Sequence, residues 1–357
     1  MRFNISKIGK VRSTEIELND LTIICGKNNT AKTYITYTLY GFMDFIENRR
    51  FKTSDFFKDD LMIFETSKEE EVRISINRLK DFVKDDLTQQ FSRTIPNLFS
   101  SKNKAFNDSS LKLLDDFNIK DIHFNRLSFL GGFAIEIKKR EEDEYFSIIK
   151  TSVENESLKN KDELSYDLLY FAINNEIKAI IREVILNKIP NAFISSVERS
   201  GISLFQKEIT LSRSRVYDEF FYNKKSIKDL FAGTNRNKFS AYPLPIRDNL
   251  KFVQDLFFTY RELSLFIKKH DYLLDEFRDL IGGEYLIDDD NEEVRFIPHN
   301  ESLELSMMES SSSIRSLCDL GVYLKFFAEE GDLIIIDEPE LNLHPENQRK
   351  LARLFAK

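Results

Sequence analysis

A short apolar run near the carboxyl end of the chain is followed directly by two carboxylates. Residues 331–339 read GDLIIIDEP, and no charged residue interrupts the apolar centre of this segment. An uninterrupted run of this length is typical of a parallel strand that is buried on both faces. In α/β sheets, ligands bind beyond the carboxyl ends of such strands, where Asp337 and Glu338 stand here. The segment therefore predicts an α/β fold that handles nucleotide phosphates.

A second motif, close to the amino terminus, matches a phosphate-binding loop. Residues 26–33 read GKNNTAKT, and they stand between an expected strand at 21–25 and an expected helix with apolar residues at helical spacing. Backbone N–H groups of such a loop and the positive end of the helix cradle phosphates. The pattern predicts that Lys32 reaches the β- and γ-phosphates and that Thr33 holds Mg²⁺. The residues expected to line the phosphates are Gly26, Lys27, Asn28, Asn29, Thr30, Ala31, Lys32 and Thr33.

Ala31 departs from the usual form of this loop, which has glycine at the corresponding position. Its Cβ crowds a backbone that must approach phosphate closely, and a left-handed conformation there would cost about 1–2 kcal/mol. We therefore expect weaker nucleotide binding than a loop with glycine would give. A catalytically weak, nucleotide-gated scaffold remains an alternative to an active enzyme.

Together the two motifs resemble the ATPase heads of the ABC superfamily, in the soluble branch that includes SMC, RecF and OLD-like proteins. The resemblance implies that Asp337 binds Mg²⁺, that Glu338 is the general base, and that Lys32 stabilises the transferred charge. Residues 342–345 resemble the loop that crosses the dimer interface in that branch. The implied fold is α/β: a P-loop NTPase head with a mainly parallel sheet, an N-terminal antiparallel β part and a largely helical insertion.

Four serines open an expected helix shortly before the Asp-Glu strand. Clustered hydroxyls and free N–H groups at a helix start suit an anion. The resemblance implies that Ser311, Ser312 and Ser313 form a signature segment, which contacts the γ-phosphate bound by the opposite subunit, although glycine is commoner there. A flexible loop with a helix cap is the simpler interpretation of the serines alone, and the strand that follows them favours the signature.

The head is expected to combine residues 1–48 and 284–357, with residues 49–283 as a mostly helical insertion or arm. Within the insertion, 133–138 and 145–150 alternate apolar and polar residues and predict a β-hairpin. ABC heads continue with a further strand and a sensor histidine after the Asp-Glu motif. The chain ends at Lys357, so we expect its C-terminal head segment to be truncated.

Two further segments, an acidic run at 288–293 and the segment 191–201, each allow more than one interpretation. The acidic run at 288–293 is expected to be a solvated hairpin turn rather than a metal cluster. Residues 191–201 predict a buried strand that leads into a loop with glycine, and Arg199 stands in this loop. Two interpretations of Arg199 remain open, a role in coupling nucleotide to a partner and a plain surface charge.

Composition limits the partners that we expect. Fifty-two basic and 60 acidic residues give a net charge of −8, so DNA binding is possible but not indicated by charge. No segment approaches the ~20 apolar residues that cross a bilayer, and a cytoplasmic location without a membrane partner is expected. Cys25 and Cys318 are expected to be free, buried thiols, and the absence of a CxxC pattern argues against a zinc-hook ATPase.

The resemblance finally implies a function. It implies an ATPase that uses ATP and Mg²⁺ and acts as a switch, forming a homodimer through ATP-sandwiched heads. Similar ATPases are the sensor or regulatory subunits of bacterial anti-phage systems such as PARIS and Septu, and they act with a separate nuclease or effector. A RecF-like ATPase of DNA repair and recombination is the alternative.

Overall fold

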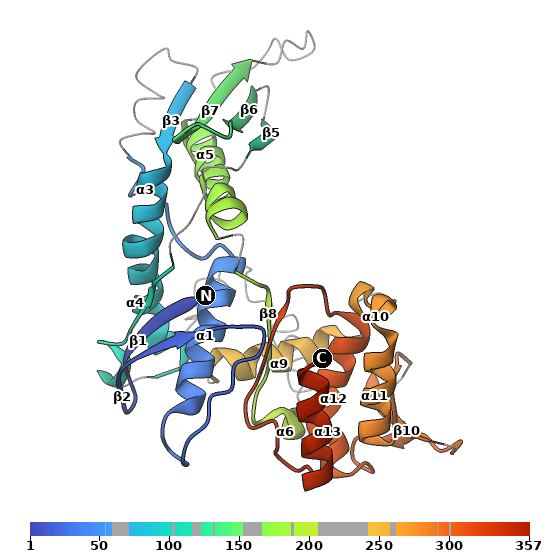
Figure 1. Ribbon diagram of the computed structural model, residues 1–357. Helices are drawn as coiled ribbons and strands as arrows, with labels where there is room; N and C mark the ends of the chain where they lie inside the picture. The colour runs from blue at the N-terminus through green and yellow to red at the C-terminus, as the bar shows by residue number, and fades with distance from the viewer. Residues whose placement is uncertain are drawn as a thin grey trace, which may run out of the picture. The chain divides into compact units, whose positions relative to one another are not determined.

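The computed structural model describes residues 1–53, 55–58, 71–101, 104–115, 123–130, 133–152, 166–186, 189–205, 242–257, 262–290, 292–299 and 301–357. The chain folds into two compact units, each assembled from separate stretches (Figure 1). Unit 1 comprises Met1–Thr22, Phe42–Ile95 and Phe106–Ile189. Unit 2 comprises Ile23–Gly41, Pro96–Ala105 and Pro190–Lys357. The predicted boundaries at residues 48 and 283 remain a prediction.

Unit 1 contains two antiparallel sheets. In the first, β1 (Arg2–Ile8) lies between β2 (Val11–Glu17) and β4 (Ser110–Leu113), which confirms the predicted N-terminal antiparallel part. The second sheet has the order β3-β7-β6-β5. Its strands are β3 (Glu71–Ser75), β5 (Phe124–Leu130), β6 (Phe133–Lys139) and β7 (Tyr145–Ser152). The antiparallel pairing of β6 with β7 confirms the predicted hairpin.

The helices of unit 1 pack around a core rich in phenylalanine. Edge-to-face contacts join Phe91 to Phe42, with ring centroids 5.2 Å apart, and to Phe45, with centroids 5.5 Å apart. Such pairs add stabilisation beyond the burial of their area. The helical elements of unit 1 are α3 (Ile76–Asp81), the π-helical η1 (Phe82–Leu87), most of α4 (Thr88–Leu98), α5 (Tyr166–Ile180), the π-helical η4 (Ile181–Ile185) and the end of α1 (Lys32–Glu47). The 3₁₀ turn η2 (Lys104–Phe106) lies at the boundary between the stretches of the two units.

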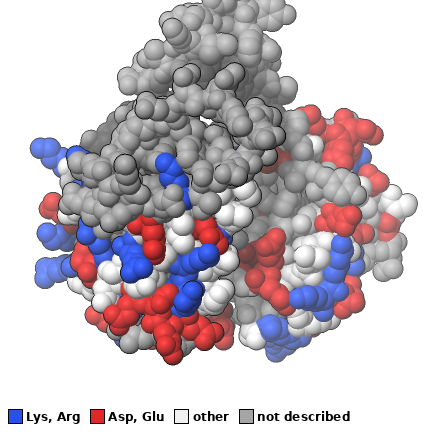
Figure 2. All heavy atoms as spheres, turned by 90° about the horizontal axis from the view of Figure 1, so that it is seen from above, with Lys and Arg blue, Asp and Glu red and all other residues white. Residues whose placement is uncertain are grey.

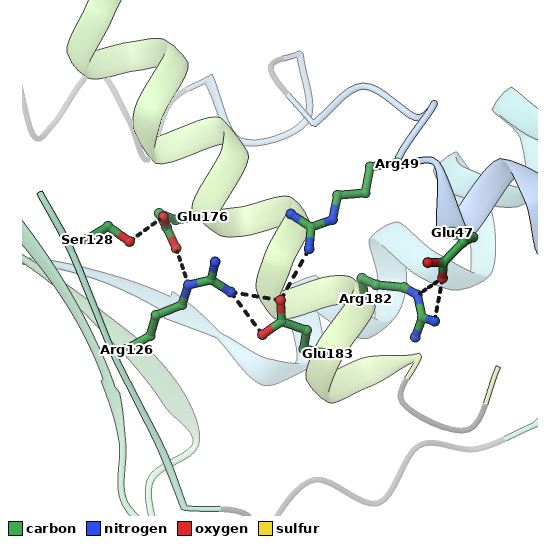
Figure 3. A network of polar contacts seen from close by, with 7 residues as sticks. All are labelled: Glu47, Arg49, Arg126, Ser128, Glu176, Arg182 and Glu183. Carbon is green, nitrogen blue, oxygen red and sulfur yellow. Dashed lines mark hydrogen bonds and ion pairs between the residues drawn. The ribbon is translucent and has the colours of Figure 1, made fainter. Parts of the chain in front are cut away.

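A network of ion pairs connects β5, the α5–η4 helix and the end of α1 (Figure 3). Arg126 of β5 bonds both Glu176, at 3.2 Å, and Glu183, at 2.7 Å, and Arg49 contacts Glu183 at 3.2 Å. These side chains are partly exposed, so each pair stabilises unit 1 by about 1 kcal/mol or less. The charged members are Glu47, Arg49, Arg126, Glu176, Arg182 and Glu183.

Unit 2 contains a parallel strand pair and a separate antiparallel sheet. β8 (Ala192–Ser195) and β12 (Leu333–Ile336) pair in parallel, with Ala192 opposite Leu333 and Ser195 opposite Ile336. This pairing confirms the two strands predicted from the apolar runs. The antiparallel sheet has the order β11-β10-β9, from β9 (Gly283–Asp288), β10 (Glu293–Pro298) and β11 (Leu305–Ser306).

The acidic run at 288–293 lies in the β9–β10 hairpin, as predicted. Asp288 pairs with Arg295 of β10 at 2.9 Å, and Glu293 pairs with the same guanidinium at 2.9 Å. Among the described residues, no three His, Cys, Asp or Glu side chains are grouped to hold a metal ion. The run is therefore a turn whose charges are partly neutralised by the neighbouring strand.

The helices of unit 2 cover these strands. Gly321 of α12 lies so close to α11 and β9 that a Cβ there would meet Phe277 at 2.6 Å and Tyr285 at 2.7 Å. Glycine therefore sets the close approach of α12 to its neighbours; α11 contacts both α12 and α13 (Figure 1). The helices are the first part of α1, α6 (Arg199–Leu204), α9 (Leu244–Asp255), α10 (Leu265–Lys269), α11 (Asp271–Ile281), α12 (Ser312–Phe326) and α13 (Pro345–Phe355).

Four expectations need correction or restatement. The strand predicted at 21–25 is wrong, because these residues pair with no described strand and Ile23 is 78% exposed. Cys25 is exposed, whereas Cys318 is buried as expected. Besides its helices, the described part of the predicted insertion contains the four-stranded sheet of unit 1 and also β8 of unit 2, so it holds more strands than the single predicted hairpin. Among the described strands only β8 and β12 pair in parallel, so the mainly parallel sheet remains a prediction.

Candidate functional site

The glycine-initiated loop before α1 is closed by its own lysine. The Lys32 ammonium donates to the carbonyls of Gly26, at 2.9 Å, and Lys27, at 3.2 Å. The Thr30 hydroxyl donates to the Lys27 carbonyl at 2.7 Å, which tightens the same turn. The ammonium group therefore lies over the loop at the start of α1, where the free N–H groups and the positive helix end favour an anion. The predicted helix after Lys32 is confirmed.

Two loop residues adopt left-handed backbone conformations that favour glycine. Asn29 has φ +61° and Ala31 has φ +74°. Asparagine tolerates this region, whereas alanine is strained there because its Cβ approaches the following carbonyl oxygen. The conformation explains why the motif usually has glycine at the position of Ala31.

Asp337 and Thr33 meet in unit 2. The backbone N–H of Asp337 donates to the Ser195 carbonyl at 3.0 Å, which extends the parallel ladder to the end of β12. Asp337 is only 4% exposed, and the Thr33 hydroxyl lies close enough to its carboxylate to lower the pKa. Burial raises the pKa of Asp337, whereas the nearby Thr33 hydroxyl opposes this rise. The Oδ2 atom of this carboxylate has no hydrogen-bond partner among the described residues.

Glu338 differs from its neighbour in exposure and backbone conformation. Its side chain is exposed to solvent, and its φ of +49° is left-handed. Its charge contributes to the raised pKa of Asp337, as does the charge of Glu198. The Asp337 carboxylate is therefore buried, whereas the adjacent Glu338 carboxylate is accessible to solvent.

Tyr37 and Glu198 were missed as site residues by the sequence analysis. The Tyr37 hydroxyl donates to Glu198 Oε2 at 3.4 Å; the charge of Glu198 raises the pKa of Asp337, and the charge of Asp337 contributes to the raised pKa of Tyr37. Tyr37 follows Thr33 by four residues, so the two share one face of α1. Glu198 follows β8 just as Glu338 follows β12. Two sequence signals could have identified them: the helical spacing of Tyr37 from Thr33, and the presence of a glutamate shortly after each of the two apolar runs.

Arg199 is buried, and the interpretation as a plain surface charge is therefore wrong. Its side chain is 1% exposed. The guanidinium donates to the backbone carbonyls of Asp337 and Glu338, both at 2.7 Å. Arg199 is therefore part of the site, because it binds the backbone of both acidic residues.

The serine cluster forms a helix cap, as the simpler interpretation predicted. Ser311 caps α12, where its hydroxyl accepts from the Ile314 N–H at 3.4 Å and lies 2.8 Å from the Ser313 hydroxyl. Ser311 and Ser312 are exposed. The Ser310 hydroxyl donates to the carbonyl of Ser306 in β11 at 2.8 Å, and none of these contacts tests the predicted role in binding phosphate. The signature role therefore remains a prediction.

The segment after Glu338 is held against α6 and α13. The Asn342 amide donates to the Ser200 hydroxyl at 3.4 Å, and Asn342 has φ +63°. His344 Nδ1 accepts from the Glu346 N–H at 3.3 Å and caps α13. His344 thus has a structural role at a helix start. Nothing in these contacts tests the predicted dimer-crossing role of residues 342–345.

The chemistry of these groups fits Mg²⁺ and a phosphate chain. Mg²⁺ prefers oxygen ligands and typically takes one or two protein carboxylates while phosphate oxygens and water complete its shell. Asp337 offers an unpartnered buried oxygen beside the Thr33 hydroxyl. Lys32 and the start of α1 supply the positive field that phosphates need. No larger cluster of acids is required for this binding mode.

Replacing Ala31 by glycine should stabilise the protein. Relief of the left-handed strain should raise the free energy of unfolding by about 1 kcal/mol, after the greater freedom of glycine in the unfolded chain is subtracted. Ala352 is an exposed residue inside α13, so Ala352→Gly should instead lower it by about 1 kcal/mol. Urea unfolding of both variants checks this prediction, and a loss of stability in Ala31→Gly would contradict it.

Replacing Asp337 by asparagine should stabilise the unliganded protein. The ATP affinity of the variant should no longer depend on Mg²⁺. The folded state raises the pKa of Asp337, so its ionisation lowers stability as pH rises from about 4 through the raised pKa. Asp337→Asn should remove this cost, so the variant should unfold at a higher temperature than the wild type at pH 7. Thermal unfolding in EDTA measures it, with Asp290→Asn in the exposed β9–β10 turn as control. If the variant is less stable than the wild type, or if Mg²⁺ still raises its ATP affinity, Asp337 is not the Mg²⁺ ligand.

Comparisons with known proteins assign the chain to a family. A segment of 192 residues is 26% identical to Reticulocyte-binding protein homolog 1 of Plasmodium falciparum (isolate 3D7) and covers 51% of this chain but 6% of that protein. No solved structure matches. None of the described helices is long and apolar enough to span a membrane. The sequence model of the AAA ATPase domain family matches residues 3–357, almost the whole chain. The chain therefore belongs to the AAA ATPase domain family.

Proposed function

We propose that this chain binds and hydrolyses ATP with Mg²⁺ and acts as a nucleotide-dependent switch. The proximity of the Thr33 hydroxyl to the buried Asp337 carboxylate carries the proposal, because it brings the start of α1 near the end of β12. One oxygen of Asp337 is buried and unpartnered among the described residues, as a cation ligand should be before the ion binds. Membership of the AAA ATPase domain family supports ATP as the nucleotide.

Each residue of the site has a separate task in this proposal. Thr33 and Asp337 hold Mg²⁺, and the backbone of Gly26 to Lys32 holds the phosphates. Lys32 exchanges the loop carbonyls that it now binds for phosphate oxygens and stabilises their charge. Glu338 orients the attacking water and accepts its proton. ATP supplies the phosphoanhydride bond, and Mg²⁺ neutralises the charge that develops on it.

Dimerisation would complete the site. Ser311 and Ser312 are exposed at the start of α12, and a helix start with free hydroxyls suits the phosphate chain bound by a second copy. In this proposal the site belongs to an ABC-type head with a mainly parallel sheet, and residues 342–345 face the opposite subunit. ATP closes the two heads, and hydrolysis releases them.

The biological role that we propose is a cytoplasmic sensor subunit of a bacterial anti-phage system. In this proposal the inserted segment at residues 49–283 would dock a separate nuclease or effector. A DNA-clamping role of the RecF type is less well supported by charge. On the face that Figure 2 shows, acidic and basic side chains of the described residues are interspersed rather than gathered into one basic surface, and the net charge is −8.

Replacing Lys32 by alanine should abolish ATP binding. The ammonium group is the positive side chain aimed over the loop, so its loss should weaken Mg-ATP binding by at least about 100-fold. Calorimetric titration of Mg-ATP measures the affinity. Lys350→Ala removes an exposed lysine of α13 and should bind as the wild type does. Wild-type protein that takes up no ATP would refute the proposed function.

Replacing Glu338 by glutamine should trap ATP and stabilise a dimer. Glutamine keeps the shape of the side chain but cannot accept the proton from water, so turnover should fall by about 100-fold or more. Size-exclusion chromatography with Mg-ATP should then show more dimer than for the wild type. Glu340→Gln changes an exposed carboxylate two residues away and serves as the control. Unchanged turnover in Glu338→Gln would remove Glu338 from the mechanism.

A further inference from the structure

The buried guanidinium of Arg199 joins three segments of unit 2. Besides the carbonyls of Asp337 and Glu338, it donates to the carbonyl of Ser196 at 3.0 Å and to that of Ser316 at 2.7 Å. Ser196 follows β8, Ser316 lies near the start of α12, and the two acidic residues follow β12. One side chain therefore holds the ends of both parallel strands and the first turns of α12.

These bonds constrain the backbone at Glu338. A left-handed conformation is unfavourable for glutamate, so the surrounding structure must maintain the φ of +49°. The Arg199 Nη2–H bond to the Glu338 carbonyl and the Leu341 N–H bond to the same carbonyl, at 3.0 Å, both act on this residue. These two hydrogen bonds to the Glu338 carbonyl therefore set the direction of the Glu338 side chain.

The shape of the arginine head is essential for this arrangement. A planar guanidinium presents five N–H donors in a rigid fork, whereas a lysine ammonium is a compact charge without a fixed plane. The fork lets Arg199 reach the carbonyls of Ser316, Asp337 and Glu338 at once. Asp319 of α12 is buried nearby and attracts the guanidinium, so the charge of Arg199 is also balanced.

We propose that Arg199 is a positioning residue that fixes the backbone of Asp337 and Glu338 and thereby aims the Glu338 carboxylate. Its bond to Ser316 makes this aim depend on the position of α12. Ser316 in turn is tied to the serine cluster, because its hydroxyl donates to the Ser313 carbonyl at 2.9 Å. A ligand that moves the start of α12 would thus alter the orientation of Glu338. The catalytic part of this inference rests on the proposed ATPase function.

A purely structural role makes a different prediction from a positioning role. Asn249 is also buried, at 2% exposure, and supports the same end of β8. Its side chain accepts from the Ser196 N–H at 2.8 Å and donates to the Ile194 carbonyl. Within the described part of the chain, neither of these hydrogen bonds involves Asp337 or Glu338. Asn249→Ala is therefore a matched control that loosens β8 but leaves the bonds to the acidic residues in place.

The test compares Arg199→Lys with Asn249→Ala and the wild type. Lysine keeps the positive charge beside Asp319 and loses the fork. We expect Arg199→Lys to bind Mg-ATP within about threefold of the wild type and to lose about 100-fold in kcat. Asn249→Ala should lower thermal stability at least as much and keep kcat within about threefold of the wild type. Hydrogen exchange of unliganded protein should be about tenfold faster at residues 337–341 in Arg199→Lys alone.

The outcomes separate this inference from the proposed function. If the wild type hydrolyses ATP and Arg199→Lys has the same kcat, the positioning role is overturned while the ATPase stands. If the wild type does not hydrolyse ATP, the proposed function fails, and the exchange of residues 337–341 still decides whether Arg199 holds this backbone. If Arg199→Lys does not fold, the double variant Arg199→Gln, Asp319→Asn removes the buried charges together and carries the same test.

Discussion

The parallel pairing of β8 with β12 is the constraint on which the site depends. The two strands come from distant parts of the sequence and run side by side in register, so their carboxyl ends meet at one edge. Ser196, Glu198 and Arg199 follow one strand, and Asp337 and Glu338 follow the other. Pairing in any other register would move the guanidinium away from the carbonyls that it binds. The site is thus a consequence of strand register rather than of any single motif.

The same edge of the sheet contains several buried charged groups. Their burial lowers the stability of the protein, unless a partner or a ligand compensates for it. Asp337 and Asp319 have pKa values raised chiefly by burial, and burial lowers the pKa of Arg199. Perturbed groups of this kind gather at functional sites because the shifts that serve chemistry oppose stability. Arg199 offsets part of the cost by donating to four backbone carbonyls. Among the described residues, both Asp319 and Asp337 keep one buried oxygen without a hydrogen-bond partner, and that of Asp337, at the end of β12, is suited to a cation.

Local sequence patterns predicted those parts of the site that local forces determine. The helix after Lys32, the cap at Ser311, the β9–β10 hairpin and the strands β8 and β12 follow from spacing, capping and apolar runs. The strand expected at 21–25 failed because strand formation requires a partner, and apolar residues alone do not supply one. Cys25, at the end of that segment, is exposed for the same reason. The composition of unit 1 likewise gave no sign of its four-stranded sheet beyond the β6–β7 hairpin.

Ala31 and Glu338 show where this limit lies. Both have left-handed backbones. The strain at Ala31 could be anticipated, because the loop motif itself requires the conformation and only the residue type departs from it. The conformation of Glu338 could not, because it is maintained by Arg199, which reaches it only after β8 and β12 have paired. A residue that acts through the backbone of another leaves no motif of its own, and its role can be inferred only once the partner carbonyls are located.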